Sequence, residues 1–408
     1  MRKLYLIPTT AVAISLKDVV KVFYMSIVKN NSNEEFKILL NKVIGYKYSE
    51  LFPSGTVAMK ELLTELSKSS IKKEVIIPAY SCPSIYYAVV AAELIPVLVD
   101  IEYETLSINP RILKPEINDN TLAIIVPHMF GKNAKLKQIK EISKDNNIIL
   151  IEDMAQSLDN YSHNKNENAC LGDYCVLSFA RAKNISTIAG GAILSNNQET
   201  MLRINNIVDK YPIKSLNSKI LLFLTMIGYA IVVHPYIYYW VEKFTRGDSK
   251  KNEDPFKLIK IKKRLIEKYK YTKIQSSLGI VLLSKISLIN GIRIKNGQLL
   301  YNKINKFKNI NVLANTSNLY LRFVILSKSK VIKDLIIKQL YSAGIRASTA
   351  DFPVFTRLNP PAKNVSNLFP IACLVEKEIL TLPTHSFVKE SQLLEMSDII
   401  ERGNHNQA

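Results

Sequence analysis

Three short segments carry polar side chains whose types and spacing could do chemistry together. The first, Ser54-Gly55-Thr56, directly precedes an amphipathic helix predicted over residues 56–67. N–H groups at a helix N-terminus point outward and favour an anion, and a glycine lets the backbone approach that anion closely. An ordinary Ser or Thr cap is the alternative interpretation. The segment therefore predicts either a phosphate site or a simple helix cap.

The second segment places Asp153 and Gln156 just after an apolar run at residues 147–151. A carboxylate that emerges at the end of a buried strand can hold a protonated ring nitrogen of a bound ligand. A helix cap or a surface acid would fit the same position of Asp153. The acid is therefore a candidate cofactor contact, with both alternatives open.

The third segment runs from Ser178 to Lys183-Asn184 and is followed by Gly190-Gly191. A lysine in a loop between two strands is an unusual place for a solvated charge. Partial burial lowers the pKa of a lysine and frees its amine for Schiff-base chemistry. The alternative is a surface lysine, since the chain has 55 Lys and Arg residues.

Short apolar runs alternate with helical patterns between residues 54 and 196, which predicts a mostly parallel sheet covered on both faces. Ligands bind at the carboxyl ends of the strands in such sheets, where all three segments lie. Strands are expected within 75–77 (ended by Pro78), 94–101, 122–129, 147–151, 175–179, 191–194, 321–326 and 378–382, and helices over 56–67, 134–146 and 330–343. Gly344 is expected to end the last helix.

The order of the three segments resembles the DegT-type (DegT/DnrJ/StrS) sugar aminotransferases, which are pyridoxal-phosphate (PLP) enzymes. The resemblance implies an α/β fold like that of aspartate aminotransferase, with a mostly parallel central sheet and a smaller C-terminal α/β domain. It covers residues 35–205 well and 270–400 loosely. Further segments that carry it are residues 74–78, 96–101, 127–131 and 171–173.

The resemblance implies a role for each matched residue. Lys183 matches the lysine that binds the cofactor covalently, and Asp153 matches the acid that keeps the ring nitrogen protonated. Gln156 matches the glutamine beside the phenolic oxygen. Tyr80 is placed where the family has an aromatic residue stacked on the ring, with core packing as the alternative. The phosphate cup is matched by Gly55, Thr56 and Ser178.

The sequence departs from the family pattern at three places. Ala189 stands where an acidic residue usually precedes the two glycines, and 180–182 replaces an aromatic-Pro-Thr-like run. Lys268-Tyr269-Lys270 stands where Asn-Tyr-Arg often reaches the phosphate of the partner subunit. A lysine can meet a phosphate as a point charge, so either lysine is a candidate for completing the partner's site.

The resemblance implies transfer of an amino group, with glutamate as the donor, to a keto group of a nucleotide-linked or lipid-linked sugar. A cytoplasmic homodimer in polysaccharide or antibiotic-sugar synthesis is implied with it. One alternative is a PLP-dependent sugar dehydratase, but those relatives have a His in place of the lysine, and Lys183 argues against it. Another is a non-catalytic scaffold or regulatory protein of the same fold.

The net charge and the cysteine content limit the classes of partner and of metal or redox site that the chain could have. The formal net charge of +20 favours anionic partners such as diphosphate-linked substrates or acidic lipid. Nucleic acid is not expected, because the chain lacks a compact basic recognition motif with interleaved aromatics. The four cysteines form no CxxC pair, so we expect neither a metal nor a redox motif. The N-terminus is interpreted as mature structure on the cytoplasmic side.

Four regions are expected: an N-terminal arm over 1–30, a large cofactor domain over 31–210, an apolar insert with a basic linker over 211–268, and a small domain over 269–408. Within the insert, residues 218–246 are long enough to span a bilayer, for which about 20 apolar residues suffice. A span would separate Lys183 from the Gln275 region, and Pro235 interrupts the segment. Contact with the inner face of a membrane, or burial in a dimer or core, is favoured instead.

Overall fold

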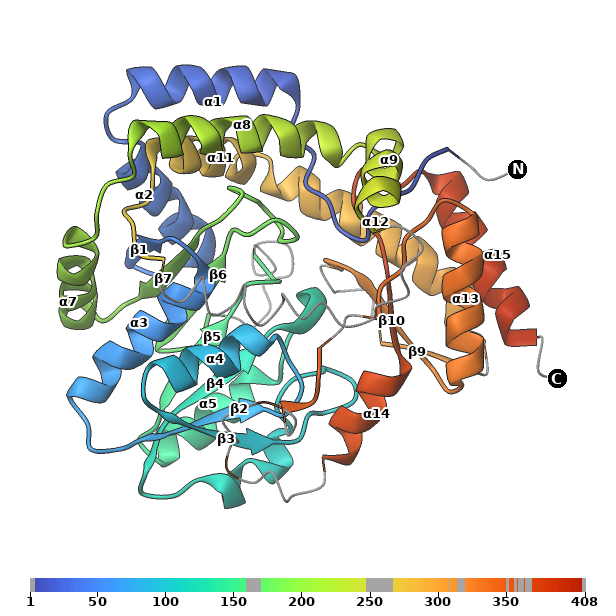
Figure 1. Ribbon diagram of the computed structural model, residues 1–408. Helices are drawn as coiled ribbons and strands as arrows, with labels where there is room; N and C mark the ends of the chain where they lie inside the picture. The colour runs from blue at the N-terminus through green and yellow to red at the C-terminus, as the bar shows by residue number, and fades with distance from the viewer. Residues whose placement is uncertain are drawn as a thin grey trace.

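The computed structural model describes residues 4–158, 170–246, 267–307, 309–313, 320–349, 352–355, 358, 363 and 369–405. A seven-stranded sheet with the order β1-β7-β6-β5-β4-β2-β3 forms its centre (Figure 1). Six of its strands run in one direction and β7 runs opposite to them, so the predicted mostly parallel sheet is confirmed. The strands are β1 (Tyr48–Phe52), β2 (Glu74–Pro78), β3 (Ile95–Val99), β4 (Thr121–Pro127), β5 (Ile149–Asp153), β6 (Tyr174–Ser178) and β7 (Gly191–Ser195).

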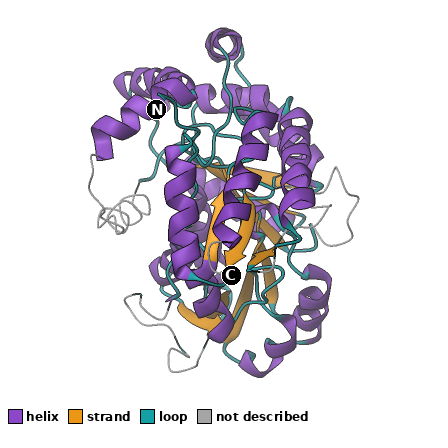
Figure 2. Cartoon of the chain, turned by 90° about the vertical axis from the view of Figure 1, so that its right-hand side faces the viewer, coloured by secondary structure: helices purple, strands orange, loops and turns teal. Residues whose placement is uncertain are grey.

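Helices cover both faces of this sheet, which explains why its strands are continuous apolar runs. Val75 and Ile77 of β2 pack in one core with α3 (Gly55–Lys68) and α4 (Pro83–Ala91). Ile76, which points to the opposite face, packs in another core with α5 (Leu136–Asp145). Figure 2 shows the strands in the interior with the helices outside them. All seven residues of β4 are buried.

A second, three-stranded antiparallel sheet with the order β10-β9-β8 belongs to the C-terminal part of the chain. Gly344 ends α13 at a φ of 76°, as the sequence predicts. The short strand β8 was not expected. The strands are β8 (Ile310–Val312), β9 (Phe323–Ser327) and β10 (Ile379–Leu382). The helices of the C-terminal part are α12 (Ile286–Ile304), α13 (Lys330–Ser342), α14 (Pro370–Glu378) and α15 (Glu390–His405).

The N-terminal part is helical and packs against a segment distant in the sequence. Helices α1 (Leu16–Val28) and α2 (Ser32–Ile44) both contact α11 (Lys273–Leu283). All three share a core with β6 and β7 of the large sheet. Helix α7 (Gln198–Asp209) lies against β1 and α3. The division into four regions stays a prediction, and α11, on the far side of the expected boundary at 268, packs with the large sheet.

The apolar segment forms two helices, α8 (Leu216–Val232) and α9 (Pro235–Arg246), bent by 107°. The bend lies at Pro235, where the sequence places it. Helix α9 is tied to the C-terminal part by the Glu242–Arg346 ion pair (2.7 Å). Among the described residues no single helix is long and apolar enough to cross a membrane. Two bent pairs of helices, α8 with α9 and α11 with α12, are together long and apolar enough to do so by length and composition alone.

Candidate active site

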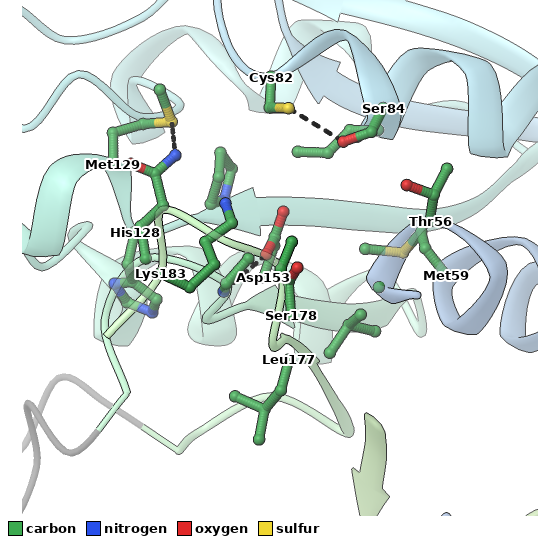
Figure 3. A pocket seen from close by; sticks show the side chains of 17 residues that line it. Thr56, Met59, Cys82, Ser84, His128, Met129, Asp153, Leu177, Ser178 and Lys183 are labelled. Carbon is green, nitrogen blue, oxygen red and sulfur yellow. Dashed lines mark hydrogen bonds between the residues drawn. The ribbon is translucent and has the colours of Figure 1, made fainter. Parts of the chain in front are cut away.

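A cavity opens at the carboxyl ends of β4, β5 and β6, where parallel strands present their last residues at one edge. The N-terminal turns of α3 and α4 complete its wall. Figure 3 shows side chains from these elements directed into one space. Six of the seven residues predicted from the sequence line it: Gly55, Thr56, Asp153, Gln156, Ser178 and Lys183.

The first turn of α3 forms a close-fitting backbone cradle. The Ser54 side chain accepts the N–H of Val57, while the first-turn N–H groups of Gly55 and Thr56 have no acceptor within the helix. A Cβ built on Gly55 would lie 2.9 Å from the Cβ of Ser178, and one on Gly191 would lie 2.4 Å from the Gly55 nitrogen. Only glycine therefore fits at both positions, and the cradle suits an anion.

Lys183 is presented by the loop that joins β6 to β7. The preceding residue, Ala182, has a φ of 126°, a conformation that costs a non-glycine residue about 1–3 kcal/mol. The loop is held at its other end by the amide of Gln275, which donates to the Ala189 carbonyl at 2.7 Å. Ala189, which stands where the family usually has an acidic residue, therefore helps to hold this loop through its backbone carbonyl.

Asp153 ends β5 and faces Lys183 across the cavity (Figure 3). One of its carboxylate oxygens accepts the N–H of Ala155 at 2.9 Å, which fixes the rotamer. Burial raises the pKa of Asp153, and the Ala155 N–H and the charge of Lys183 oppose that rise. A cation placed beside this carboxylate would be strongly favoured, because the site is removed from water.

Gln156 stabilises the loop that follows β4. Its side-chain oxygen accepts the N–H of Phe130 at 3.1 Å, and Phe130 has a φ of 57°. Its amide nitrogen lies 4.0 Å from the sulfur of Met129. Gln156 therefore lines the cavity and also fixes the backbone that forms one wall of it.

A buried His–Glu pair lies beneath the cavity. The Nδ1 of His128 accepts the N–H of Ala134 at 3.2 Å, which assigns the ring proton to Nε2. Nε2 then donates to Glu152 at 2.9 Å. Glu152 also accepts the N–H groups of Cys170 and Gly172, so its buried charge is satisfied. His128 lines the cavity in an orientation set by these bonds.

Tyr80 is the predicted site residue that does not line the cavity. It is fully buried, its backbone bridges to Val354, and its ring makes an edge contact with Phe352 at 6.1 Å. This placement favours core packing, the alternative left open by the sequence. The nearby Cys82 and Ser84 line the cavity instead, and the Sγ of Cys82 lies 3.0 Å from the Oγ of Ser84.

Several lining residues were not assigned a role from the sequence. They follow the ends of β2 and β4 or lie on the inner side of α3, so the strand-end rule could have found most of them. These residues are Met59, Cys82, Ser84, His128 and Met129. Lys268 and Lys270 lie elsewhere, paired with Glu61 at 3.0 Å and Asp209 at 3.2 Å.

More than half of the chain matches a known protein family. A sequence model of the DegT/DnrJ/EryC1/StrS aminotransferase family matches residues 16–230. The chain belongs to this family. The family predicted from the three motif segments is thereby confirmed. The cofactor of the DegT family, pyridoxal phosphate, is the predicted one.

Two sequence relatives and one solved structure illustrate the range of the DegT family. GDP-4-keto-6-deoxy-D-mannose 3-dehydratase of Escherichia coli O55:H7 is 25% identical over 76% of both chains. A dTDP-4-amino-4,6-dideoxy-D-glucose transaminase of Shigella dysenteriae is 33% identical over 41% of this chain and 45% of its own. NtdA of Bacillus subtilis, solved with pyridoxamine phosphate (PMP), shares the fold with a TM-score of 0.74, 17% identity, and coverage of 99% and 86%.

The residues of the cavity fit the DegT family cofactor. The cradle of Gly55 and Thr56, with the Ser178 hydroxyl, matches the needs of a phosphate. The Asp153 carboxylate matches a protonated ring nitrogen, and the Lys183 amine matches an aldehyde carbon. These three features line one cavity and come from α3, β5 and the β6–β7 segment.

Proposed function

We propose that this protein is a PLP-dependent aminotransferase that acts on a keto-sugar linked to a nucleotide. The amino group of glutamate would replace the keto oxygen of the sugar, and glutamate would become 2-oxoglutarate. The observation that carries the proposal is the joint placement of Lys183 and Asp153 in the cavity beside the anion cradle. Relatives that include a sugar transaminase and a sugar dehydratase support sugar chemistry in general.

In this proposal the cradle anchors the cofactor by its phosphate. The N–H groups of Gly55 and Thr56 and the hydroxyl of Ser178, which line the cavity, would donate to the phosphate oxygens. Because these donors belong to rigid elements, the cofactor is held without a further loss of side-chain freedom. When bound, PLP supplies an acceptor for the electron pair released when a C–H bond beside the amine breaks.

Asp153 would hold the proton on the ring nitrogen. Its carboxylate would accept that N–H, and its rotamer is already fixed by the Ala155 N–H. The surroundings that raise the pKa of Asp153 would strengthen the attraction between carboxylate and cation. An uncharged amide in its place would hold the proton only weakly.

Lys183 would bind the cofactor covalently through Nζ and be displaced by the donor amine. Its freed amine would then take the α-proton of glutamate and return a proton to the acceptor carbon of the sugar. The strained Ala182 and the bonds that hold the loop would keep Nζ near the reacting carbon.

A dehydratase is the second candidate, because one relative of this chain carries that name. Lys183 supports transamination over dehydration, since the dehydratases of this family have a His at that place. A non-catalytic scaffold is disfavoured by the joint retention of Lys183, Asp153 and Gln156 in one cavity. We further propose a cytoplasmic homodimer, in which Lys268 or Lys270 could reach the partner's phosphate site.

Turnover by the holoenzyme would test the proposal. A panel of nucleotide-linked keto-sugars is incubated with glutamate, and both 2-oxoglutarate and the mass of the sugar product are measured. Transamination releases one 2-oxoglutarate for each amino-sugar formed. A deoxy-sugar product without stoichiometric 2-oxoglutarate would indicate dehydration, and a protein with no cofactor absorbance would indicate a scaffold.

A further inference from the structure

Helix α1 has two apolar faces, and only one of them is used by the fold. Val19, Val22 and Met25 are buried in the core shared with α11. On the opposite face, apolar residues three or four positions apart form a second stripe along the helix. Its apolar residues are 52–71% exposed: Leu16, Val20, Phe23, Tyr24 and Ile27.

Helix α8 extends this exposed stripe into a broader surface. The rings of Phe23 and Phe223 lie 5.5 Å apart, and the two helices run side by side (Figure 1). The apolar residues of α8 that are 51–70% exposed are Leu216, Ile220, Leu221 and Leu224. We call the exposed side chains of both helices the α1/α8 face. So many exposed apolar side chains on two adjacent helices are uncommon on a protein that has no partner for them.

Exposed aromatic side chains lie on α9, the helix that follows α8 after a bend of 107°. Trp240 and Phe244 are exposed and stack with ring centroids 5.9 Å apart, and Tyr236 is exposed as well. The ammonium of Lys243 lies 5.0 Å from the Trp240 ring. Aromatic rings with nearby cations are typical of protein surfaces at the level of lipid headgroups.

The exposed charged side chains of α1, α8 and α9 are all basic. Lys17 and Lys21 lie beside the apolar stripe of α1, and Lys219 lies on α8. The carboxylates of α1, α8 and α9, Asp18 and Glu242, are buried and paired with Lys285 and Arg346. No exposed carboxylate is therefore present on these three helices.

The exposed apolar side chains and the lysines beside them bear on three possible partners for this surface: a second copy of the chain, a membrane that the helices cross, and a membrane on which they lie. A two-fold contact with a second copy would bring lysines toward lysines, because both copies present the same patch. A membrane span would have to pull α9 away from its contacts, in which Arg346 bonds Glu242 at 2.7 Å and Tyr238 at 2.6 Å. An anionic surface that also accepts apolar side chains satisfies both the lysines and the exposed stripe.

We propose that the α1/α8 face, with the aromatic end of α9, docks on the surface of an anionic phospholipid bilayer. The apolar side chains enter the boundary between headgroups and acyl chains, and the lysines contact the lipid phosphates. The enzyme then lies on the membrane without crossing it. This proposal concerns a surface outside the cavity, and it stands whether or not the proposed reaction is correct.

Sedimentation of the full-length holoprotein with vesicles tests the proposal. We expect binding to phosphatidylcholine vesicles that contain phosphatidylglycerol, and weaker binding to phosphatidylcholine alone. A variant with Val20→Gln, Tyr24→Gln, Leu221→Gln and Leu224→Gln should lower the partition coefficient by more than about tenfold. A variant with Lys17→Gln, Lys21→Gln and Lys219→Gln should lower it about fivefold per lysine on the anionic vesicles only.

Matched controls separate the surface from general stickiness. Ile71→Gln with Val331→Gln removes two apolar side chains that are 94% and 66% exposed elsewhere, and it should leave binding unchanged. Cofactor absorbance and thermal melting check that each variant is folded. Absence of vesicle binding, or equal loss in the control variant, would overturn the proposal. So would a dimer that becomes monomeric in the apolar variant without any change in lipid binding.

Discussion

The cavity and the α1/α8 face differ in how their residues are fixed. In the cavity, Asp153 and Ser178 end parallel strands and Gly55 begins a helix, so the backbone itself brings the polar groups together. On the face, apolar side chains project from helices into solvent with few constraints. The arrangement of the cavity residues therefore depends on backbone positions within a fraction of an ångström, whereas docking through the α1/α8 face depends on apolar surface area and charge.

The largest expected effect is that of Lys183→Ala. Removal of the amine abolishes covalent attachment of the cofactor, and turnover should fall on the order of 10⁴-fold or more. Absorbance spectra with and without borohydride, and a turnover assay, measure the two effects. Vesicle binding should not change, because the lysine lies in the cavity. A cofactor still fixed by borohydride in this variant would remove Lys183 from its proposed role.

Asp153→Asn should lower turnover by about 10²- to 10³-fold at saturating cofactor. The amide keeps the shape of the side chain and can still accept the Ala155 N–H, so the fold is retained. Its lack of charge weakens the hold on the ring proton. Steady-state kinetics measures the loss, and cofactor titration should show retained binding. Wild-type turnover in this variant would contradict the proposed role of the acid.

The same substitution in the two regions should have opposite effects. Gly55→Ala places a Cβ 3.0 Å from the Leu177 carbonyl oxygen and should destabilise the protein by about 1–3 kcal/mol while weakening cofactor binding. Gly228→Ala, on α8, meets nothing within 4 Å and should stabilise by about 0.5–1 kcal/mol. Urea denaturation measures both changes. Equal destabilisation by the two substitutions would mean that the cradle is not closely packed.

The last effect depends on pH and concerns the anchor of the segment that leads into α1. His385 is buried and bonds the Pro8 carbonyl, and burial together with the charge of Arg293 lowers its pKa to about 3. Between pH 6.5 and about 3 the unfolded chain therefore binds a proton that the folded protein does not. Stability falls as pH falls through this window, by up to about 1.4 kcal/mol per pH unit.

His385→Gln removes this titration while keeping a donor for Pro8. Urea denaturation at several pH values should give a flatter acid limb for the variant than for the wild type. An unchanged acid limb would show that His385 does not contribute to the pH dependence of stability.

Much of the sheet could be predicted because its strands are buried on both faces. The run at β4 is apolar from Leu122 to Pro127, and Pro78 ends β2 where the sequence indicates. Strand β4 ends at Pro127, two residues before the end of the run expected over 122–129. The cavity was predictable for the same reason, since parallel strands end at one edge. The β1 strand was missed because its sequence, YSELF, mixes polar with apolar residues.

The remaining features depend on contacts between distant segments. Tyr80 follows the end of β2 by two residues and Cys82 by four, yet Tyr80 is buried in the core, where its backbone bridges to Val354. Helix α1 fell within the expected N-terminal arm over 1–30, for which no helix was predicted. Only the position of α11 reveals which of the two faces is buried.

The place of β7 between β1 and β6 has a consequence for the nascent chain. Strand β1 at residues 48–52 pairs with β7, so it has no partner in the sheet until residues 191–195 have left the ribosome. The buried face of α1 waits longer still, for α11 at residues 273–283. At about 5–20 residues per second, this delay amounts to roughly ten seconds or more. During that interval both apolar faces of α1 are available to a chaperone or to the lipid surface.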